Sequence, residues 1–496
     1  TKTTPEQIAG IVERATGEDY EPIPKAEEKE YYPMSSTQKR TYLIQQMDPK
    51  SMTYNMPFTM KMSGEVNVSA MRNALQQMIE RHEILRTEFL TVDGELMQKI
   101  HGHVDADFGY EESSKSDREL AEEFFRPFDL SKPPFVRMKL VNKGEYHLFM
   151  LDTHHIVSDG MSQGIFINEL TSLYNGEELE PLEYQYKDYS EWMRTRDLSS
   201  QAEYWKSQFE DEIPVLDMPL DHSRPQVQSY EGASAVISTD EKLTAGIKEL
   251  VAKTGTTEYM VFLAAMMVTL SKYSRQEDIV IGSAISGRTK RETERMLGMF
   301  VNTLAMRGRP EKNKRFDQFL EEIRQTALTA YENQEYPFEE LVEAVEVKRD
   351  MSRNPLFDVM LTYQNTEDAD GELTNVEYDS AEVNTAVPAK FDLTFALTEY
   401  SEGYGINLDY CRALYSKKTA EKLLKNYIEV LREVSKRPSI LLGEIKMITA
   451  EDRELILGEF NATETEYPRD KTIAELFEEQ VERTPDNTAL VFRDKS

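Results

Sequence analysis

The stretch that constrains the fold most strongly is EYMVFLAAMMVTLSKY (258–273), which presents apolar side chains on nearly every side of a helix. A helix without a polar face has to be enclosed by other elements, because each exposed side would leave apolar surface in water. The 496 residues, 39% hydrophobic and 10% aromatic, can supply such a core, and they exclude disorder over most of the chain. Length alone predicts roughly two to four domains.

Helix-like and strand-like segments alternate along the chain in two regions. In the first region, apolar residues at helical spacing over 71–79 predict an amphipathic helix, and the apolar run 146–152 predicts a buried strand. In the second region, which begins near residue 225, Ser238 and Glu241 fit a capping box at the start of a helix. The fold class indicated is α/β (α+β).

Charge and composition restrict the partners and the location. A net charge of −32 repels phosphate backbones and anionic membranes, so neither nucleic acid nor a membrane is an expected partner. No run of 18 uncharged apolar residues occurs, so no membrane span is expected. The single cysteine, Cys411, is expected to be an inert buried residue. We expect a cytoplasmic protein, and we interpret the chain as a piece of a longer polypeptide because it begins without Met.

The segment THHIVSDGMSQG (153–164) lies between the predicted strand and a helix-like pattern. A histidine at a strand end can project into a cleft and accept a proton at neutral pH, since its unperturbed pKa is about 6.5. Adjacent strand residues point to opposite faces. His154 and His155 therefore cannot both reach one reacting atom if the strand extends through them.

Asp159 has three open roles. It could orient an imidazole as in a triad, cap the following helix, or pair with an arginine. Gly160 allows a tight turn and the close approach of a substrate, and the partial positive charge at a helix N-terminus suits a developing oxyanion. The alternative to an active site is a pair of satisfied histidines followed by an Asp-Gly turn.

Other chemistry-bearing motifs do not occur in the sequence. The remaining histidines lack metal-site spacing, so no metal is expected. No P-loop, dinucleotide fingerprint or Gly-x-Ser-x-Gly elbow is present. Periodicity and spacing by themselves indicate a mixed α/β protein with a histidine-centred strand end.

HHIVSDG (154–160) resembles the His-His-x-x-x-Asp-Gly motif of condensation domains of nonribosomal peptide synthetases. The resemblance extends over about residues 30–445. Further stretches are similar to that family's other motifs, in its order and at its spacing: YPMSSTQKRTY (32–42), RHEILRTEF (81–89), YKDYSEW (186–192), LGMFVNTLAMR (297–307), NQEYPFEELV (333–342) and RDMSRNPLFDVM (349–360).

The resemblance implies two chloramphenicol acetyltransferase-like lobes, residues 30–195 and 196–446, in a V-shaped pseudo-dimer with a central tunnel. The acidic segment 365–390 would bridge back from the second lobe. Residues 1–29 resemble the end of a carrier protein with its linker. Residues 447–496 resemble a linker and the truncated start of an adenylation domain.

The implied reaction is peptide-bond formation. An upstream donor carrier protein presents a peptidyl or aminoacyl thioester, and the α-amine of an aminoacyl thioester on a downstream acceptor carrier protein attacks it. The 4′-phosphopantetheine arms are delivered on those carriers, and no cofactor is bound covalently to this chain. The adjoining adenylation domain is a further implied partner.

The same resemblance assigns roles to the motif. His155 faces the tunnel, where it positions the amine or relays its proton, and His154 braces the loop. Asp159 pairs with an arginine, for which Arg288 is the candidate. The alternative for Arg288 is a solvent-exposed loop residue.

Three further positions depend on the resemblance. Ser158 and Asn302 are expected beside the tunnel or the substrate, although Asn302 is equally explained as a plain strand-end residue. Many relatives have Trp directly after the Asp-Gly, where this chain has Met161. The surrounding residues are most similar to domains that join an L-configured donor to an L-configured acceptor.

Three alternatives to condensation remain. An epimerisation domain of the same fold would use His155 to exchange an α-proton, but its additional Glu-Gly-His-Gly-type motif is missing. Heterocyclisation domains replace the histidine pair with Asp-based residues. An inactive carrier-docking scaffold would not need the intact motif.

Overall fold

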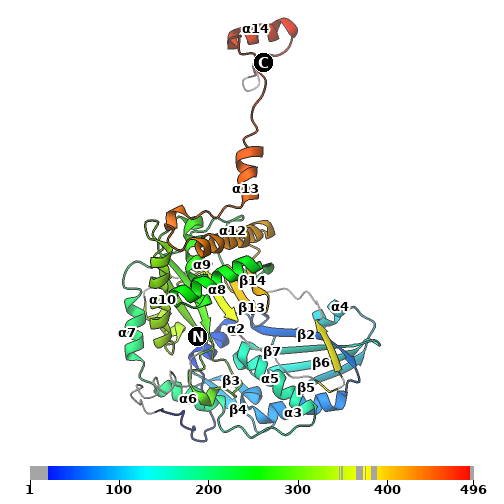
Figure 1. Ribbon diagram of the computed structural model, residues 1–496. Helices are drawn as coiled ribbons and strands as arrows, with labels where there is room; N and C mark the ends of the chain where they lie inside the picture. The colour runs from blue at the N-terminus through cyan, green and yellow to red at the C-terminus, as the bar shows by residue number, and fades with distance from the viewer. Residues whose placement is uncertain are drawn as a thin grey trace. The chain divides into compact units, whose positions relative to one another are not determined.

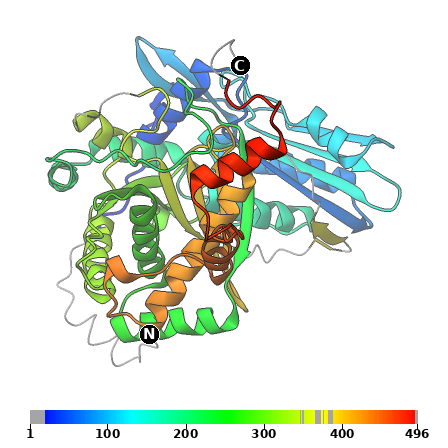
Figure 2. The ribbon, with the colours of Figure 1, turned by 90° about the horizontal axis from the view of Figure 1, so that it is seen from above.

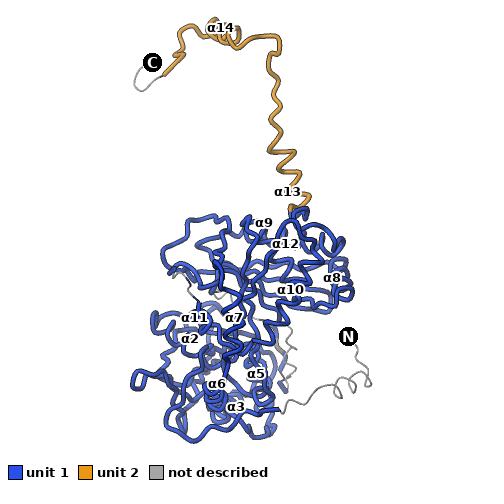
Figure 3. Tube along the Cα trace, turned by 90° about the vertical axis from the view of Figure 1, so that its left-hand side faces the viewer, with its two compact units in different colours: residues 1–447 blue, residues 448–496 orange. Residues whose placement is uncertain are grey.

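The computed structural model describes residues 20–345, 347, 350–364, 373–374, 376–380 and 388–491. The chain divides into two compact units, residues 1–447 and 448–496, each described by itself (Figure 3). Thr4 followed by Pro5 predicts from the sequence an N-cap with proline at the first helical position, and this predicted helix lies outside the described residues.

The first sheet has five strands in the order β12-β2-β7-β6-β5, and we call this sheet with its packed elements the first lobe (Figure 1). β5 and β6 are parallel, and the other neighbours are antiparallel. Helices α3 and α5 lie on one face and α4 on the other. The elements are β2 (Asn55–Gly64), α3 (Val68–Arg81), β5 (Asp107–Glu112), α4 (Asp117–Phe124), β6 (Val136–Asn142), β7 (His147–His154), α5 (Gly160–Tyr174) and β12 (Val376–Ser380).

The second sheet has six strands in the order β10-β9-β11-β13-β14-β8, and with its helices it forms the second lobe. β11 is parallel to both β9 and β13, while the other neighbours are antiparallel. In Figure 2 the green helices of this lobe lie apart from the blue and cyan sheet of the first. The elements are β8 (Gly232–Ser238), α8 (Glu241–Thr254), α9 (Glu258–Ser274), β9 (Ile279–Ile285), β10 (Asn302–Gly308), α10 (Phe316–Glu332), β11 (Val359–Gln364), β13 (Leu393–Tyr400), β14 (Gly403–Cys411) and α12 (Lys417–Lys436).

Smaller elements complete the first unit. A three-stranded sheet has the order β1-β4-β3. Its strands and the remaining helices are β1 (Tyr32–Pro33), α2 (Ser36–Met47), η1 (Glu83–Arg86), β3 (Thr87–Val92), β4 (Glu95–Ile100), η2 (His155–Val157), α6 (Tyr186–Thr195), α7 (Ser199–Ser207), η3 (Arg291–Thr293), α11 (Phe338–Ala344) and η4 (Leu442–Glu444).

The apolar helix of the sequence is α9, and the prediction of its enclosure is confirmed. Every residue from Tyr259 to Leu270 is buried. Contacts with α8, α10, α12 and β9 surround it, so no side faces water. The stripe predicted over 71–79 is also confirmed, because α3 buries Met71, Leu75 and their neighbours in the core of the first lobe.

The first lobe takes part of its core from the second half of the chain. Met296, Leu297 and Phe300 join its hydrophobic cluster, as does Val376. Val376 begins β12, which pairs antiparallel with β2. This strand lies within the acidic segment that was expected to bridge back, and its described residues do so.

The predicted capping box at Ser238 is wrong. Ser238 is the last residue of β8, and the N-cap of α8 is Asp240, whose side chain accepts the N–H of Leu243 at 2.8 Å. The pairing of β8 with β14 continues through Ser238, so the helix can begin only beyond it.

The second unit contains α13 (Ala450–Glu454), the π-helical turn η5 (Leu455–Glu459) and α14 (Ile473–Arg483). Thr472 and Glu475 form a capping box at the start of α14. None of the residues of these three elements is buried.

Truncation of α9 should destabilise the second lobe. Leu263→Ala removes a side chain with 0% exposure and leaves a cavity, so we expect a loss of about 2–5 kcal/mol in the free energy of unfolding. The matched control is Leu328→Ala on α10, where the side chain is 38% exposed and the loss should be below about 1 kcal/mol. Urea titrations measure both, and equal losses would contradict the enclosure of α9.

Candidate active site

The histidine pair lies where β7 turns into α5. β7 ends at His154, and His155 begins the 3-10 turn η2, so the strand does not extend through both residues. The turn is held by the Nδ1 atom of His154, which accepts the N–H of Ile156 at 3.1 Å. It is therefore this turn, and not strand alternation, that separates the two imidazoles.

His154 is enclosed in the first lobe. Its side chain has 0% exposure, and its Nε2 lies 3.5 Å from Gln45 Oε1. The Phe128 ring meets it edge-on, with centroids 5.8 Å apart. Burial, with the neighbouring positive charges, lowers the pKa of His154 to about 3. The imidazole is neutral at physiological pH and serves the structure of the turn.

His155, unlike His154, is only partly buried. Its backbone N–H donates to the carbonyl of Tyr54 at 2.8 Å, and the two rings are edge-on with centroids 6.2 Å apart. Within the described part of the chain, Nδ1 is buried without a hydrogen-bond partner. Burial and the charge of Lys390 lower the pKa of His155 to about 4, although Asp159 opposes them. A neutral imidazole has one unprotonated ring nitrogen, which can accept a proton or a hydrogen bond.

Asp159 combines two of its three possible roles. Its Oδ1 accepts the N–H of Ser162 at 2.8 Å and so caps α5, and its Oδ2 accepts the N–H of Phe300 at 3.0 Å. Arg288 Nη2 lies 3.4 Å from Oδ1, with both side chains buried. Among the described residues no hydrogen bond joins Asp159 to His155, which leaves the triad role without support.

Arg288 enters the first lobe from the loop after β9. Its guanidinium donates to Ser162 Oγ at 2.7 Å and to the carbonyl of Met296 at 2.9 Å, and it stacks 4.1 Å from the centroid of the Phe300 ring. Gly287 has φ +65, and the Phe300 carbonyl oxygen lies 1.9 Å from where a Cβ would stand. Only glycine fits at 287, so the loop holds Arg288 against the start of α5.

Ser158 and Gly160 flank Asp159. Ser158 is buried, and its Oγ donates to the carbonyl of Asp159 at 3.4 Å. Gly160 is exposed, and a Cβ there would meet nothing within 4 Å. The open space at Gly160 leaves room for another molecule at the N-terminus of α5, and its φ is not left-handed.

The side chain of Asn302 forms hydrogen bonds with other residues of the protein. Nδ2 donates to the carbonyls of Gln334 and Tyr336 at 2.9 and 2.8 Å, and Oδ1 accepts the N–H of Phe338 at 3.1 Å. These bonds hold the segment that leads into α11. They favour the interpretation of Asn302 as a structural residue over contact with a substrate.

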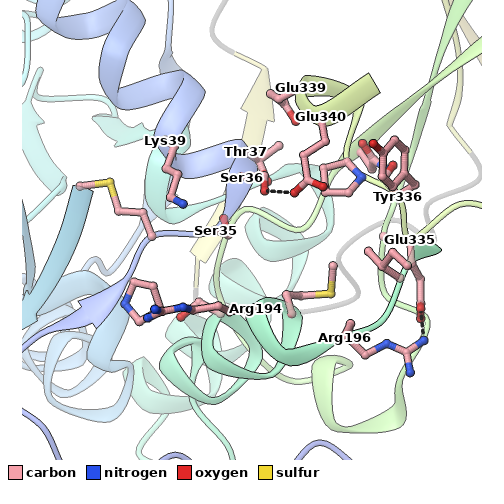
Figure 4. Close-up of a pocket in the computed structure, with 18 of the residues that line it drawn as sticks. Ser35, Ser36, Thr37, Lys39, Arg194, Arg196, Glu335, Tyr336, Glu339 and Glu340 are labelled. Atoms are coloured by element: carbon pink, nitrogen blue, oxygen red, sulfur yellow. Dashed lines mark hydrogen bonds and ion pairs between the residues drawn. The ribbon is translucent and has the colours of Figure 1, made fainter. Parts of the chain in front are cut away.

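A cavity of about 810 Å³ lies near the motif but does not include it. The first turn of α2, α6, the segment 287–302 and the start of α11 line it (Figure 4). Ser36 Oγ donates to Glu340 Oε1 at 3.2 Å on this side, which joins the two lobes. Asn302 belongs to the lining, and His155 does not.

Sequence reasoning missed Lys390 and Tyr54. Lys390 Nζ lies 4.8 Å from the centroid of the Tyr54 ring, beside His155. Burial, with the charge of Arg40, lowers the pKa of Lys390 to about 8. No local pattern could have found this lysine, because only the tertiary structure brings it to the motif.

Among the described residues, no group of three or more His, Cys, Asp and Glu side chains is arranged to hold a metal ion. The same part of the chain contains no helix that is both long and apolar enough to cross a membrane. Cys411 ends β14, is buried and has its pKa raised by burial.

Solved structures define the fold class. A four-domain nonribosomal peptide synthetase bound to AMP and glycine superposes with a TM-score of 0.83 over 97% of this chain and 38% of its own, at 22% identity. The X-domain from teicoplanin biosynthesis gives a TM-score of 0.79 over 86% of this chain and 100% of its own, at 23% identity. The fold is the chloramphenicol acetyltransferase-like α/β fold, as expected.

The Condensation domain family model matches residues 28–457, and the chain belongs to that family. Bacitracin synthase 3 of Bacillus licheniformis is 44% identical over 96% of this chain and 8% of its own length. Gramicidin S synthase 2 of Brevibacillus brevis is 42% identical over 98% of this chain and 11% of its own. The chain thus spans 8% and 11% of the length of these curated relatives. These matches confirm the resemblance to condensation domains that the sequence motifs indicated.

The Asp159–Arg288 pair should couple energetically. Asp159→Ala or Arg288→Met leaves one buried charge without its partner, so each should lower the free energy of unfolding by about 3–5 kcal/mol. The double variant should lose clearly less than the sum, since both charges go together. Urea unfolding of the four proteins measures the coupling, and strictly additive losses would exclude a stabilising pair.

His154 should make stability depend on pH. The unfolded chain binds a proton at His154 near pH 6.5, whereas the folded chain binds it only near pH 3. Stability is therefore lost as pH falls below about 6.5, by about 1.4 kcal/mol per pH unit from this residue. His154→Asn keeps an acceptor for the Ile156 N–H and cannot titrate, so its free energy of unfolding should fall less steeply. Urea titrations from pH 6.5 to 4.5 test this, and parallel curves would disprove it.

Proposed function

We propose that this domain forms an amide bond between two carrier-bound thioesters. A donor carrier protein supplies a peptidyl or aminoacyl thioester, and an acceptor carrier protein supplies an aminoacyl thioester with a free α-amine. Both groups are carried on 4′-phosphopantetheine arms, with no cofactor on this chain. Membership of the condensation domain family supports the class of reaction, and the partly exposed imidazole of His155 at the strand-to-helix junction supports the place.

The acceptor nitrogen attacks the donor carbonyl carbon. A C–N bond forms, the C–S bond of the donor thioester breaks, and the amine proton ends on the departing sulfur, so the donor arm leaves as a thiol. The lengthened chain remains on the acceptor carrier. Thioesters are already activated acyl groups, and much of the rate comes from holding the two arms in register.

His155 is the residue proposed to meet the amine. With a pKa of about 4 the imidazole is neutral over the physiological range and accepts the N–H of the attacking amine. Its low basicity favours positioning and brief relay of the proton over removal of the proton before attack. Asp159, Arg288, His154 and Ser158 hold the loop through the contacts described above, and the open space at Gly160 lets substrate come close.

The proposal includes a division of the chain. Residues 30–195 and 196–446 are the two lobes whose junction forms a tunnel for the two arms. Residues 1–29 end a carrier protein, and residues 447–496 lead into an adenylation domain, which makes both neighbours working partners. The donor and acceptor residues that are joined both have the L configuration.

Transfer between loaded carriers tests the proposal. A donor carrier bearing an aminoacyl group and an acceptor carrier bearing an amino acid are mixed with the full chain, and intact mass spectrometry follows both. Growth of the acceptor-bound species is expected. Exchange of the donor α-proton without growth would indicate epimerisation, and no change on either carrier would indicate a docking scaffold; both contradict the proposal.

His155→Ala should slow this transfer by about 100-fold or more, because the amine loses its hydrogen-bond acceptor. The matched control is His103→Ala, which removes an exposed imidazole far from the motif in sequence and should transfer at the wild-type rate. Single-turnover rates at pH 7.5 measure both. A wild-type rate for His155→Ala would remove its proposed role.

A further inference from the structure

Lys390 belongs to the second lobe by its backbone. It stands three residues before β13, and its carbonyl oxygen accepts hydrogen bonds from Gln228 Nε2 at 2.9 Å and Asn354 Nδ2 at 3.0 Å. The preceding residue, Ala389, donates its N–H to the carbonyl of Tyr230 at 3.0 Å. These bonds fix the point from which the lysine side chain starts.

The side chain of Lys390 ends at the first lobe. Its Nζ lies 4.8 Å from the centroid of the Tyr54 ring, in the position of a cation–π contact. Tyr54 accepts the backbone N–H of His155 and packs its ring against both His154 and His155, with centroids 6.5 and 6.2 Å apart. One residue of the first lobe thus contacts both the lysine and the histidine pair.

The charged groups around Lys390, Tyr54 and the two histidines do not neutralise the ammonium of Lys390. Within the described part of the chain no carboxylate forms an ion pair with its ammonium, and the nearby Arg40 is held by Glu339 at 3.3 Å. The carboxylate of Asp159 favours a higher pKa of His155, against the effect of Lys390, but this carboxylate is paired with Arg288. The titratable and charged groups around His155 and Lys390 are Arg40, Tyr54, His154 and Asp159. Tyr230 interacts with Arg40 and so belongs to the same surroundings.

We propose that Lys390 is a positioning residue that acts together with burial to keep the imidazole of His155 unprotonated, so that a charge from the second lobe contributes to the state of the proton acceptor in the first. The inference rests on the proposed function of His155. An imidazolium has no lone pair for the attacking amine, and a cation held nearby makes that form unfavourable. Because Lys390 itself has a pKa of about 8, it is charged across the acid range in which His155 would otherwise protonate.

Removing the positive charge of Lys390 should raise the pKa of His155 above about 4, while burial, the larger cause, still holds that pKa below its ordinary value. Lys390→Gln should therefore lose activity at low pH and keep it at high pH, where His155 is neutral in either case. Lys390→Arg keeps the charge and should follow the wild type.

The first measurement is the pH profile of single-turnover transfer between loaded carriers from pH 5 to 8. Each variant is compared with the wild type at the same pH, which removes the common effect of protonating the acceptor amine. Relative to its ratio at pH 8, Lys390→Gln should be about twofold slower at pH 5, because a rise of about one unit leaves about half of the His155 imidazoles protonated there. Lys390→Arg and Lys418→Gln, an exposed lysine on α12, should show no such pH-dependent loss. A profile of Lys390→Gln parallel to the wild type would overturn the inference.

The second measurement does not need activity. The full chain labelled with carbon-13 at histidine Cε1 is titrated by NMR, and the His155 signal is assigned by its loss in His155→Gln. Its midpoint should rise by a pH unit or more in Lys390→Gln and remain in place in Lys390→Arg; an unmoved midpoint would overturn the inference. Lys390→Met replaces Lys390→Gln if that variant unfolds early. Should the wild type form no product, the proposed function fails while this titration still decides the role of Lys390.

Discussion

The buried pair of Asp159 and Arg288 is the interaction on which the site depends. Two charges at 1% and 3% side-chain exposure are costly to desolvate, so they persist only because each has further partners. Asp159 caps α5 and accepts the N–H of Phe300, while Arg288 donates to Ser162 and to the carbonyl of Met296. These partners come from both lobes. The cost of burial is offset only when the lobes are together, and that apposition fixes the start of α5 beside His155.

The same dry environment determines the state of the histidines. Burial is the largest cause that lowers the pKa of His154 to about 3 and of His155 to about 4. The two residues then differ by their partners. The Nδ1 atom of His154 accepts a hydrogen bond from the N–H of Ile156, whereas the buried Nδ1 atom of His155 has no partner among the described residues. Burial thus favours the neutral form of both imidazoles, and only that of His155 is partly exposed, whereas His154 has 0% exposure.

Sequence reasoning succeeded where the cause lies within one segment. The enclosed helix α9, the stripe of α3 and the strand-to-helix junction all follow from spacing along the chain. It failed at Ser238, because strand pairing with β14 decides where the helix can start. It also failed at Lys390, which has no motif around it and reaches Tyr54 only through the apposition of two sheets. The pairing of Asp159 with Arg288 came from resemblance, since no pattern in the sequence indicates which arginine is near.

In the proposed transfer, the low basicity of His155 bears on the order of events. A neutral amine attacks without prior loss of its proton, and the nitrogen becomes acidic only as the C–N bond forms. A proton acceptor with a pKa of about 4 would hold that proton weakly, so in the proposed reaction His155 would pass the proton on rather than keep it. The departing thiolate is a stronger base than this imidazole and is the natural destination. A site that binds the proton weakly therefore fits a reaction in which nitrogen releases it and sulfur receives it within one turnover.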